Sequence, residues 1–540
     1  MNSVYDRALT EVGSGGYFQK KYDFIINIAF SALWSVMNLQ MLVVLVIVSH
    51  TCKLPEKTSN VTDEAWKLKY IPHQILNDEV KFEKCLIYIS PDENNLTSSC
   101  TEYEYDKTWY KSTVSIEKNW VCDKELYVMN IIAYSKVMEL IGSTFFGWLG
   151  DMYGRRLIHI VTMVLTIIGR IVSLLADTSY IVFLSGCLIT SFALWSTMQS
   201  AAVITVEISS PERRSMLTSL RSTTGSIGVA IMPFIYWWIK DWKMFIVITT
   251  APLIIFIIFS WNMIESPRWL HTNGKTKKCI QQLKRIAKAN RKNLNPETEK
   301  ELMGYIPQKT NNSLGPLALF SRPTLAINTI MHLVMMTAGS TCYAMQILSI
   351  GRDPGGNPYL ELCWQSLCEI PATCISGWLA NNLGRRYSGA TAFFVLSIAW
   401  FSIGFRSYTW ARIWWIGSIL NLIIRVSNAI AYIICNLLAY ELYPTCVRQS
   451  GMALGNVVGS LGSVIAPCIL FLVRRTDERF PGLIVSGICI CATLAVLLLP
   501  ETRNTKLPET IDEAETLRQK KQYSSVSLKI IQSQEKADSV

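Results

Sequence analysis

The sequence predicts an all-α membrane protein with twelve transmembrane helices, arranged as two six-helix bundles in parallel repeat. Three observations support this fold class. Half of the 540 residues are hydrophobic and 17% are charged, against roughly 25% charged residues in soluble proteins. Apolar runs of membrane-spanning length, about 20 residues, occur twelve times. The decapeptide GWLGDMYGRR at 147–156 returns 230 residues later as GWLANNLGRR at 377–386.

The twelve apolar runs define the predicted helices. Each run has to be helical, because a backbone in hydrocarbon must satisfy its own hydrogen bonds. The runs lie at 24–48, 127–149, 157–176, 180–202, 217–240, 244–263, 324–349, 358–380, 388–406, 411–439, 450–473 and 480–499. The polar start of the chain and the length of the first run argue against a cleaved signal peptide. The first helix is therefore expected to stay in the protein.

Lysine and arginine near the helix ends predict the orientation. Arg155, Arg156, Arg385 and Arg386 fall on one side of the membrane, together with the N-terminus and the segment 265–323. This segment has twelve Lys and Arg residues against four Asp and Glu residues. Because positively charged loops stay in the cytoplasm, we expect both termini there, and we expect the protein in the plasma membrane. The net charge of +11 then needs no nucleic-acid partner.

The predicted domains follow from these spans. They are a cytoplasmic N-terminus at 1–23, a first six-helix bundle at 24–263 with an external loop at 50–126, a basic cytoplasmic linker at 264–323, a second six-helix bundle at 324–499 and a cytoplasmic tail at 500–540. The lipid bilayer is the expected surrounding, and a monomeric state is compatible with the sequence.

The external loop has the features of an extracellular segment. It contains the four cysteines Cys52, Cys85, Cys100 and Cys122. In an oxidising compartment we expect them to form two disulfides, in one of three possible pairings. It also contains two glycosylation sequons, at Asn60 and Asn95. The other eleven cysteines lie mostly in apolar helices, where small buried side chains are expected rather than metal ligands.

Charged residues recur at matched positions in the two halves. We expect them on the cytoplasmic face, as ion pairs between the bundles that open and close one side. The second half has an amide, Asn381, where the first has the acid Asp151, so its set should be less ionic. The predicted gating residues are Asp151, Arg155, Arg156, Glu207, Arg214, Glu265, Arg268, Asn381, Arg385, Arg386, Glu441, Arg448, Glu501 and Arg503.

The sequence resembles the organic cation/anion/carnitine transporter family of the major facilitator superfamily, of the solute carrier type. The resemblance rests on YDRALTEVGSGGYFQ at the start, SHTC and WVCDKE around the external loop, GWLGDMYGRR, ESPRWLHTNGK and ELYPTCVRQSGM. It implies two parallel bundles with a substrate site at their interface near the membrane midplane. Sugar porters share some of these motifs but usually have a short first external loop.

The same resemblance implies a set of cavity residues. Aromatic faces suit organic ions, and charged residues inside a membrane are functional by default. The positions that line the cavity in relatives are Asn38, Tyr343, Glu369, Thr373, Arg425, Tyr432, Asn436 and Ser460. Thr373 stands where anion carriers have lysine, and Ser460 stands where anion and carnitine carriers have arginine and cation carriers have aspartate. A pair outside this pattern, Lys136 and Glu139, is expected to pair near the outer face; as an alternative, Glu139 is a coupling acid.

These features predict a secondary transporter of small organic ions that works by alternating access. Organic cations or zwitterions such as carnitine are the expected substrates, because Glu369 is kept while the lysine and arginine of an anion site are missing. The alternatives are an organic anion transporter, a sugar porter and a non-transporting receptor on the same scaffold. No catalytic constellation, cofactor or metal-ligand spacing is found among the five histidines, so an enzyme is not expected.

Overall fold

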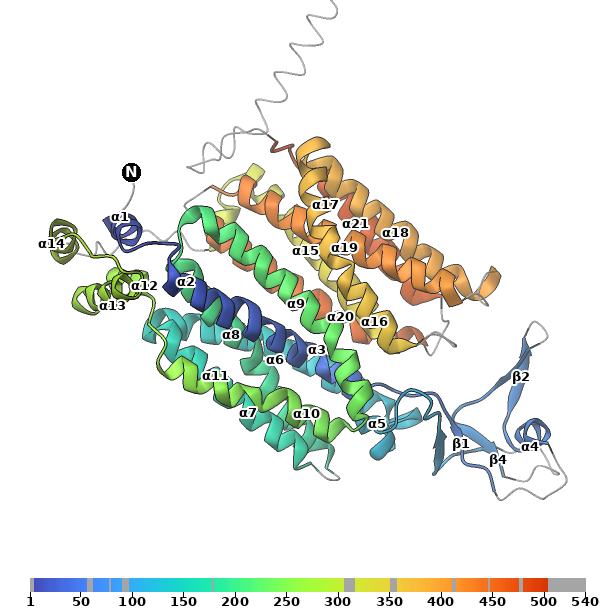
Figure 1. Ribbon diagram of the computed structural model, residues 1–540. Helices are drawn as coiled ribbons and strands as arrows, with labels where there is room; N and C mark the ends of the chain where they lie inside the picture. The colour runs from blue at the N-terminus through green and yellow to red at the C-terminus, as the bar shows by residue number, and fades with distance from the viewer. Residues whose placement is uncertain are drawn as a thin grey trace, which may run out of the picture.

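The computed structural model contains two bundles of long helices that lie side by side (Figure 1). It describes residues 4–55, 62–76, 79–89, 97–176, 179–304, 316–349, 357–409, 414–444, 447–474 and 479–503. A small domain protrudes from one end of the bundles, which we call the domain end. The helices α1, α12, α13 and α14 lie at the opposite end, which we call the linker end.

The first bundle contains six membrane-spanning helices. The first is continuous but has a π-helical middle part, Asp23–Phe30, and the last is interrupted before Pro252, because proline cannot donate a backbone hydrogen bond. The elements are α2 (Tyr17–Tyr22), η1 (Asp23–Phe30) and α3 (Ser31–Val44), then α6 (Glu125–Tyr153), α7 (Arg155–Leu174), α8 (Tyr180–Glu207), α9 (Pro211–Ile239), α10 (Trp242–Thr250) and α11 (Pro252–Trp261).

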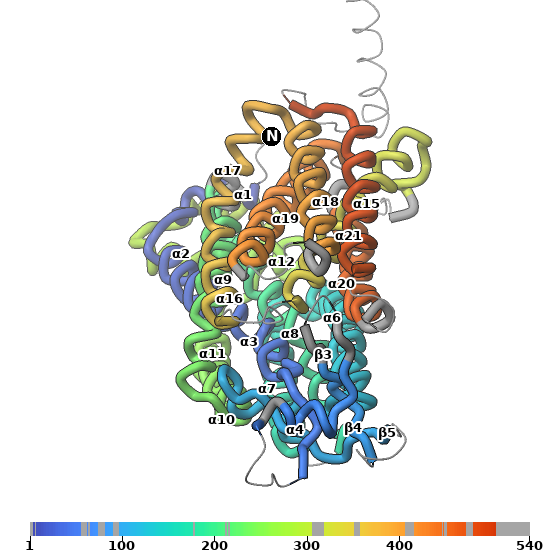
Figure 2. The backbone as a smooth tube through the Cα atoms, turned by 90° about the vertical axis from the view of Figure 1, so that its right-hand side faces the viewer, coloured from blue at the N-terminus to red at the C-terminus, as the bar shows by residue number. Residues whose placement is uncertain are grey.

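The second bundle repeats this order, and its second helix is broken. The break falls at Cys368, three residues before Pro371, which cannot donate the hydrogen bond that would continue the helix. The elements are α15 (Pro323–Ser349), α16 (Pro358–Leu367), α17 (Glu369–Asn382), α18 (Arg385–Thr409), α19 (Trp414–Leu442), α20 (Arg448–Arg474) and α21 (Phe480–Leu498). Figure 2 shows this orange-to-red half beside the blue-to-green half.

Each of the twelve predicted spans is mainly helical in its described part, and the predicted fold of two six-helix bundles is confirmed. Within the described ranges, nine helices are long and apolar enough to cross a membrane. The three remaining spans are α6, α9 and the broken pair α16–α17. Lys136 and Glu139 lie in α6, Arg221 lies in α9, and Glu369 lies in α17. These three spans are less apolar than the others because they contain charged residues.

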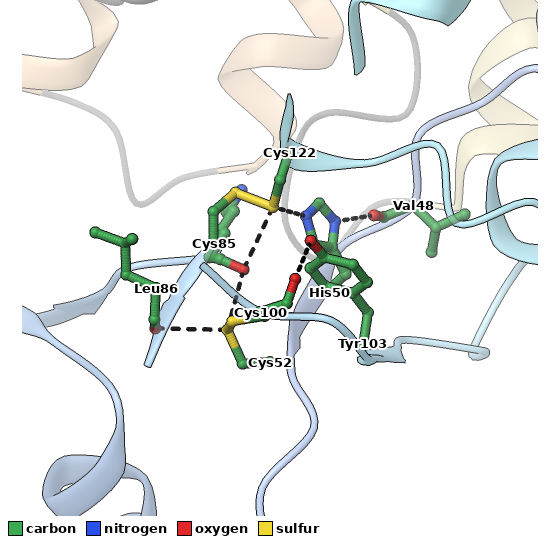
Figure 3. Close-up of a disulfide and its surroundings, with 9 residues drawn as sticks. Val48, His50, Cys52, Cys85, Leu86, Cys100, Tyr103 and Cys122 are labelled. Carbon is green, nitrogen blue, oxygen red and sulfur yellow. Dashed lines mark hydrogen bonds between the residues drawn. A yellow bond between two sulfur atoms is a disulfide. The ribbon is translucent and has the colours of Figure 1, made fainter. Parts of the chain in front are cut away.

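The external loop folds into a small domain of three two-stranded antiparallel sheets. The structure pairs Cys52 with Cys100 and Cys85 with Cys122, as Figure 3 shows. The elements are β1 (His50–Cys52) with β6 (Tyr103–Tyr105), β2 (His73–Leu76) with β3 (Glu79–Phe82), β4 (Leu86–Tyr88) with β5 (Thr97–Ser99), and the helices α4 (Asp63–Tyr70), α5 (Val114–Glu117) and η2 (Cys122–Lys124). The sequon residues Asn60 and Asn95 lie outside the described residues.

A histidine packs beside the second disulfide. His50 Nε2 lies 3.6 Å from Cys122 Sγ, and Nδ1 lies 2.9 Å from the carbonyl oxygen of Val48. Burial lowers the pKa of His50, which favours the neutral ring. His50, Cys85 and Cys122 are close enough to hold a metal ion, but both sulfurs belong to the disulfide and are not thiolate ligands.

The linker folds against the N-terminal segment and the first bundle. Its helices are α12 (Pro267–Thr272), α13 (Thr276–Ala289), α14 (Pro296–Gly304) and η3 (Pro316–Phe320), and the N-terminal helix is α1 (Val4–Glu11). Apolar residues of α1, α12, α13 and α14 form one cluster with the ends of the first bundle's helices. Asn290 joins the two segments, because its side chain donates to the carbonyl oxygen of Val12 and accepts from the N–H of Phe18.

Candidate functional site

A buried ion pair lies in the second bundle. Arg425 Nε is 2.6 Å from Glu369 Oε1, and the two side chains are 1% and 20% exposed. Arg425 comes from the middle of α19, and Glu369 is the first residue of α17, directly after the helix break. A carboxylate is favoured at a helix N-terminus, so the break places the acid where its charge is stabilised.

Two further groups complete this cluster. The Arg425 guanidinium lies over the ring of Tyr343 of α15, 4.6 Å from its centroid. Ser226 Oγ donates to Glu369 Oε2 at 2.9 Å. Ser226 belongs to α9 of the first bundle, so this hydrogen bond connects the two halves at the charged cluster. No sequence pattern marked Ser226, because a serine in an apolar helix is usually a packing residue whose hydroxyl bonds within its own helix.

The structure brings together three of the eight predicted cavity residues: Tyr343, Glu369 and Arg425. The other five have no described contact with this cluster and stay predictions. Thr373, Asn436 and Ser460 bond to carbonyl oxygens of their own helices, those of Ile370, Tyr432 and Asn456. Tyr432 is half-exposed, and Asn38 is partly buried on α3.

A second charged pair lies on α6 of the first bundle. Lys136 Nζ is 2.7 Å from Glu139 Oε2, so the predicted pairing is present. Lys136 is the twelfth residue of a 29-residue helix, and the pair is therefore nearer to the middle of the helix than to its outer end, where the sequence placed it.

The predicted gating residues of the first half form a network at the linker end. Arg155 Nη2 lies 2.9 Å from Asp151 Oδ1 and 3.8 Å from Glu207 Oε1. Glu265 accepts from the backbone N–H groups of Arg155 and Arg156, each at 3.1 Å, at the start of α7. Burial raises the pKa of the Glu265 carboxyl, although these N–H groups act to lower it.

The second half repeats this network with one change. Glu501 accepts from the backbone N–H groups of Arg385 and Arg386, at 2.9 and 3.0 Å. Arg385 makes two bonds to Glu441, from Nε at 3.2 Å and from Nη2 at 3.1 Å. Because Asn381 has no charge, the Arg385 guanidinium pairs with Glu441 alone, whereas Arg155 in the first half lies beside two acids.

The predicted ion pairs between the bundles are not formed among the described residues of this structure, and they stay a prediction. Each described contact joins residues of one half. Glu265 and Glu501 accept from the start of the helix that follows the Gly-containing turn of the same bundle, and Glu207 and Glu441 lie beside an arginine of their own half. Arg268 lies over the ring of Tyr5, and Arg503 donates to the carbonyl oxygen of Asn382 at 2.8 Å, again within one half. The side chains of Arg214 and Arg448 are not among those that the structure describes.

Aromatic residues, instead, hold the two halves together at the domain end. Tyr359 of α16 packs against the rings of Tyr110, Tyr236 and Trp237, with centroid distances of 5.3, 6.2 and 6.4 Å. Its hydroxyl donates to the carbonyl oxygen of Trp109 at 2.8 Å. Among the apolar clusters of the described chain, the one that mixes residues of both halves contains Tyr359. The structure is therefore closed at the domain end.

Truncating Tyr359 is expected to open this end. Tyr359→Ala removes a side chain that is 2% exposed, at a cost of about 3 kcal/mol, and favours conformations with the domain end open. A cysteine placed at Leu42, which lies beside Tyr359, should then react at least tenfold faster with an impermeant maleimide added on the domain side. Tyr359→Phe keeps the ring and should change the rate less. Equal rates for Tyr359→Ala and the unchanged residue would show that this contact does not close the end.

Comparisons with known proteins agree with this geometry. Residues 93–514 match the model of a family described as "Sugar (and other) transporter". The chain is 24% identical to the beta-alanine transporter of Drosophila melanogaster, over 95% of this chain and 89% of that protein. It is 24% identical to the human organic cation/carnitine transporter 2, over 94% and 93%, and 26% identical to bovine solute carrier family 22 member 7, over 95% and 96%.

Solved structures share the fold. The xylose transporter XylE from E. coli, in a partially occluded inward open conformation, superposes with a TM-score of 0.57 at 16% identity, over 71% of this chain and 90% of that one. The same protein bound to a bromodeoxyglucose, described as a major facilitator superfamily symporter, gives a TM-score of 0.53 at 18% identity, over 74% and 91%. The predicted major facilitator fold is therefore confirmed.

Proposed function

Because this chain belongs to the sugar (and other) transporter family, we propose that it transports small zwitterions, which have an ammonium group and a carboxylate, by alternating access. The relatives that resemble the chain over most of its length are solute carriers for organic ions, so the chain is a multi-pass membrane transporter of small organic molecules and not an enzyme. The plasma membrane, cytoplasmic termini and the zwitterion itself are parts of the proposal.

The buried pair of Glu369 and Arg425 is the observation that supports a zwitterion. A simple cation beside Glu369 would add a net positive charge next to Arg425, and a simple anion beside Arg425 would add a net negative charge next to Glu369. An uncompensated charge in a buried site costs several kcal/mol. A zwitterion brings no net charge, so the charge of the site does not change when the substrate binds.

The aromatic ring beside the pair fits the same substrate class. Tyr343 offers its face to a cation, and Arg425 occupies that face in the structure. A substrate ammonium can therefore take the place of the Arg425 guanidinium over this ring, where a cation–π contact contributes about 1–2 kcal/mol. Two of the relatives are named for zwitterions, beta-alanine and carnitine, which supports the proposal without establishing the substrate.

An uptake panel tests the proposal. Cells that express the chain are expected to take up labelled β-alanine or carnitine in a saturable manner, and to take up choline, an aromatic carboxylate and a hexose at least tenfold less efficiently. Cells with an empty vector are the control. Uptake confined to the aromatic carboxylate would favour organic anion transport, and uptake confined to the hexose would favour a sugar porter. No uptake despite surface expression would favour a receptor.

A further inference from the structure

Among the side chains that the structure describes, three arginines lie in the bundle helices at positions distant from the linker-end network, and two of them have a side-chain partner. Arg425 is paired with Glu369, although its Nε and Nη1 atoms make no described hydrogen bond. Arg170 of α7 donates to the carbonyl oxygen of Met37 at 3.1 Å, and the Gln40 amide, with its oxygen turned toward the guanidinium, accepts from it at 3.0–3.1 Å. Arg170 is 2% exposed and serves to hold the first membrane helix.

The third arginine, Arg221 of α9, has a hydrogen-bond donor that no described residue uses. Its Nη1 atom is buried and has no hydrogen-bond partner among the described residues. The ion pairs of the described chain do not include Arg221. The residue as a whole is partly exposed. A guanidinium inside a membrane bundle is costly when it has no acceptor, and a bound anion would remove this cost.

Arg221 lies on the part of α9 that faces the first membrane helix. Ser31 Oγ donates to the carbonyl oxygen of Arg221 at 3.0 Å, and Thr224 Oγ1 donates to the carbonyl oxygen of Asn27 at 2.7 Å. Five residues further along α9, Ser226 reaches Glu369 of the second half. At 1.5 Å per residue, this places Arg221 about 7.5 Å along the helix axis from the residue that contacts the acid.

We infer that Arg221 binds the carboxylate of the transported zwitterion, while Glu369 binds its ammonium. The inference rests on the proposed function and assigns the anionic end of the substrate to the first half. Glu369 keeps Arg425 on its Oε1 atom and offers Oε2, which accepts from Ser226, to the ammonium. Arg425 therefore retains its counter-ion, whereas Arg221 has no ion pair among the described residues, and arginine binds carboxylates with two parallel hydrogen bonds. An extended short zwitterion with a hydrogen bond at each end spans the two poles and connects the halves.

Binding measurements with three molecules of matched shape test this assignment. The purified full-length protein in nanodiscs is titrated with β-alanine, with propylamine, which lacks the carboxylate, and with propionate, which lacks the ammonium. Arg221→Gln is expected to weaken β-alanine binding at least tenfold and to leave propylamine binding within twofold. Arg221→Lys should recover part of the loss. Lys240→Gln, which removes an exposed charge at the far end of the same helix, is the matched control and should change nothing.

The outcomes separate this inference from the proposed function. If β-alanine binds to the unchanged protein and equally well to Arg221→Gln, the proposed function stands and the role of Arg221 is wrong. An equal loss of β-alanine and propylamine binding would also overturn it, because it would show a structural role. If propionate binds and β-alanine does not, and Arg221→Gln abolishes propionate binding, the anion site stands and the zwitterion proposal falls. Binding of none of the three molecules, with no binding of carnitine either, overturns both.

Discussion

Replacing Glu369 with glutamine is expected to lower zwitterion uptake about a hundredfold. The substitution leaves the Arg425 guanidinium, which is 1% exposed, without a counter-ion, at a cost of about 3 kcal/mol, and each 1.36 kcal/mol is a factor of ten. It also removes the proposed partner of the substrate ammonium. Uptake of labelled β-alanine or carnitine, normalised to the protein at the cell surface, measures the effect.

A second variant separates binding from stability. In the double variant Glu369→Gln/Arg425→Met, both charges are removed together, so no buried charge is stranded and surface expression should return toward that of the unchanged protein. Zwitterion uptake should stay low, because the acid is still missing. If the double variant regains full uptake, Glu369 has a structural role only, and the substrate does not bind there.

Replacing Glu265 with alanine is expected to destabilise the protein by about 2–4 kcal/mol. Glu265 accepts from two backbone N–H groups at the start of α7, and each buried donor that loses its acceptor costs about 1–3 kcal/mol. The adjacent Gly154 has a φ of +109°, and a Cβ there would lie 2.5 Å from Glu265 Oε2. The turn is therefore built around this carboxylate. Heating the detergent-solubilised protein and measuring the fraction that stays monodisperse reports the loss.

Asp151→Asn is the matched control for Glu265→Ala. The Asp151 side chain is 73% exposed, and its partner Arg155 is the first residue of the following helix, α7, so we expect a change within about 0.5 kcal/mol. The sequence alone drew attention to Asp151, because it is the acid that the second repeat lacks. A loss with Asp151→Asn as large as that with Glu265→Ala would show that the exposed pair, and not the buried helix cap, determines the stability of the turn.

The sequence by itself determined the number of helices, their order and the repeat. These properties depend on local information, because an apolar run of about 20 residues must form a helix in hydrocarbon whatever surrounds it. The decapeptide at 147–156 and its copy at 377–386 placed the two turns at equivalent positions. The resemblance in the motifs also identified Tyr343, Glu369 and Arg425 as candidate residues.

The tertiary structure alone decided which charges meet. Arg425 and Glu369 are 56 residues apart in the chain, and Ser226 is in the other half, so their contact depends on how helices rotate and pack, which helical periodicity does not specify. The same holds for the linker-end acids: the structure shows Glu265 and Glu501 as helix caps within their own halves, a role that the sequence did not predict. Arg221 was missed because a single arginine in an apolar run forms no recognisable sequence pattern. Only the folded bundle shows that its Nη1 atom has no hydrogen-bond partner among the described residues.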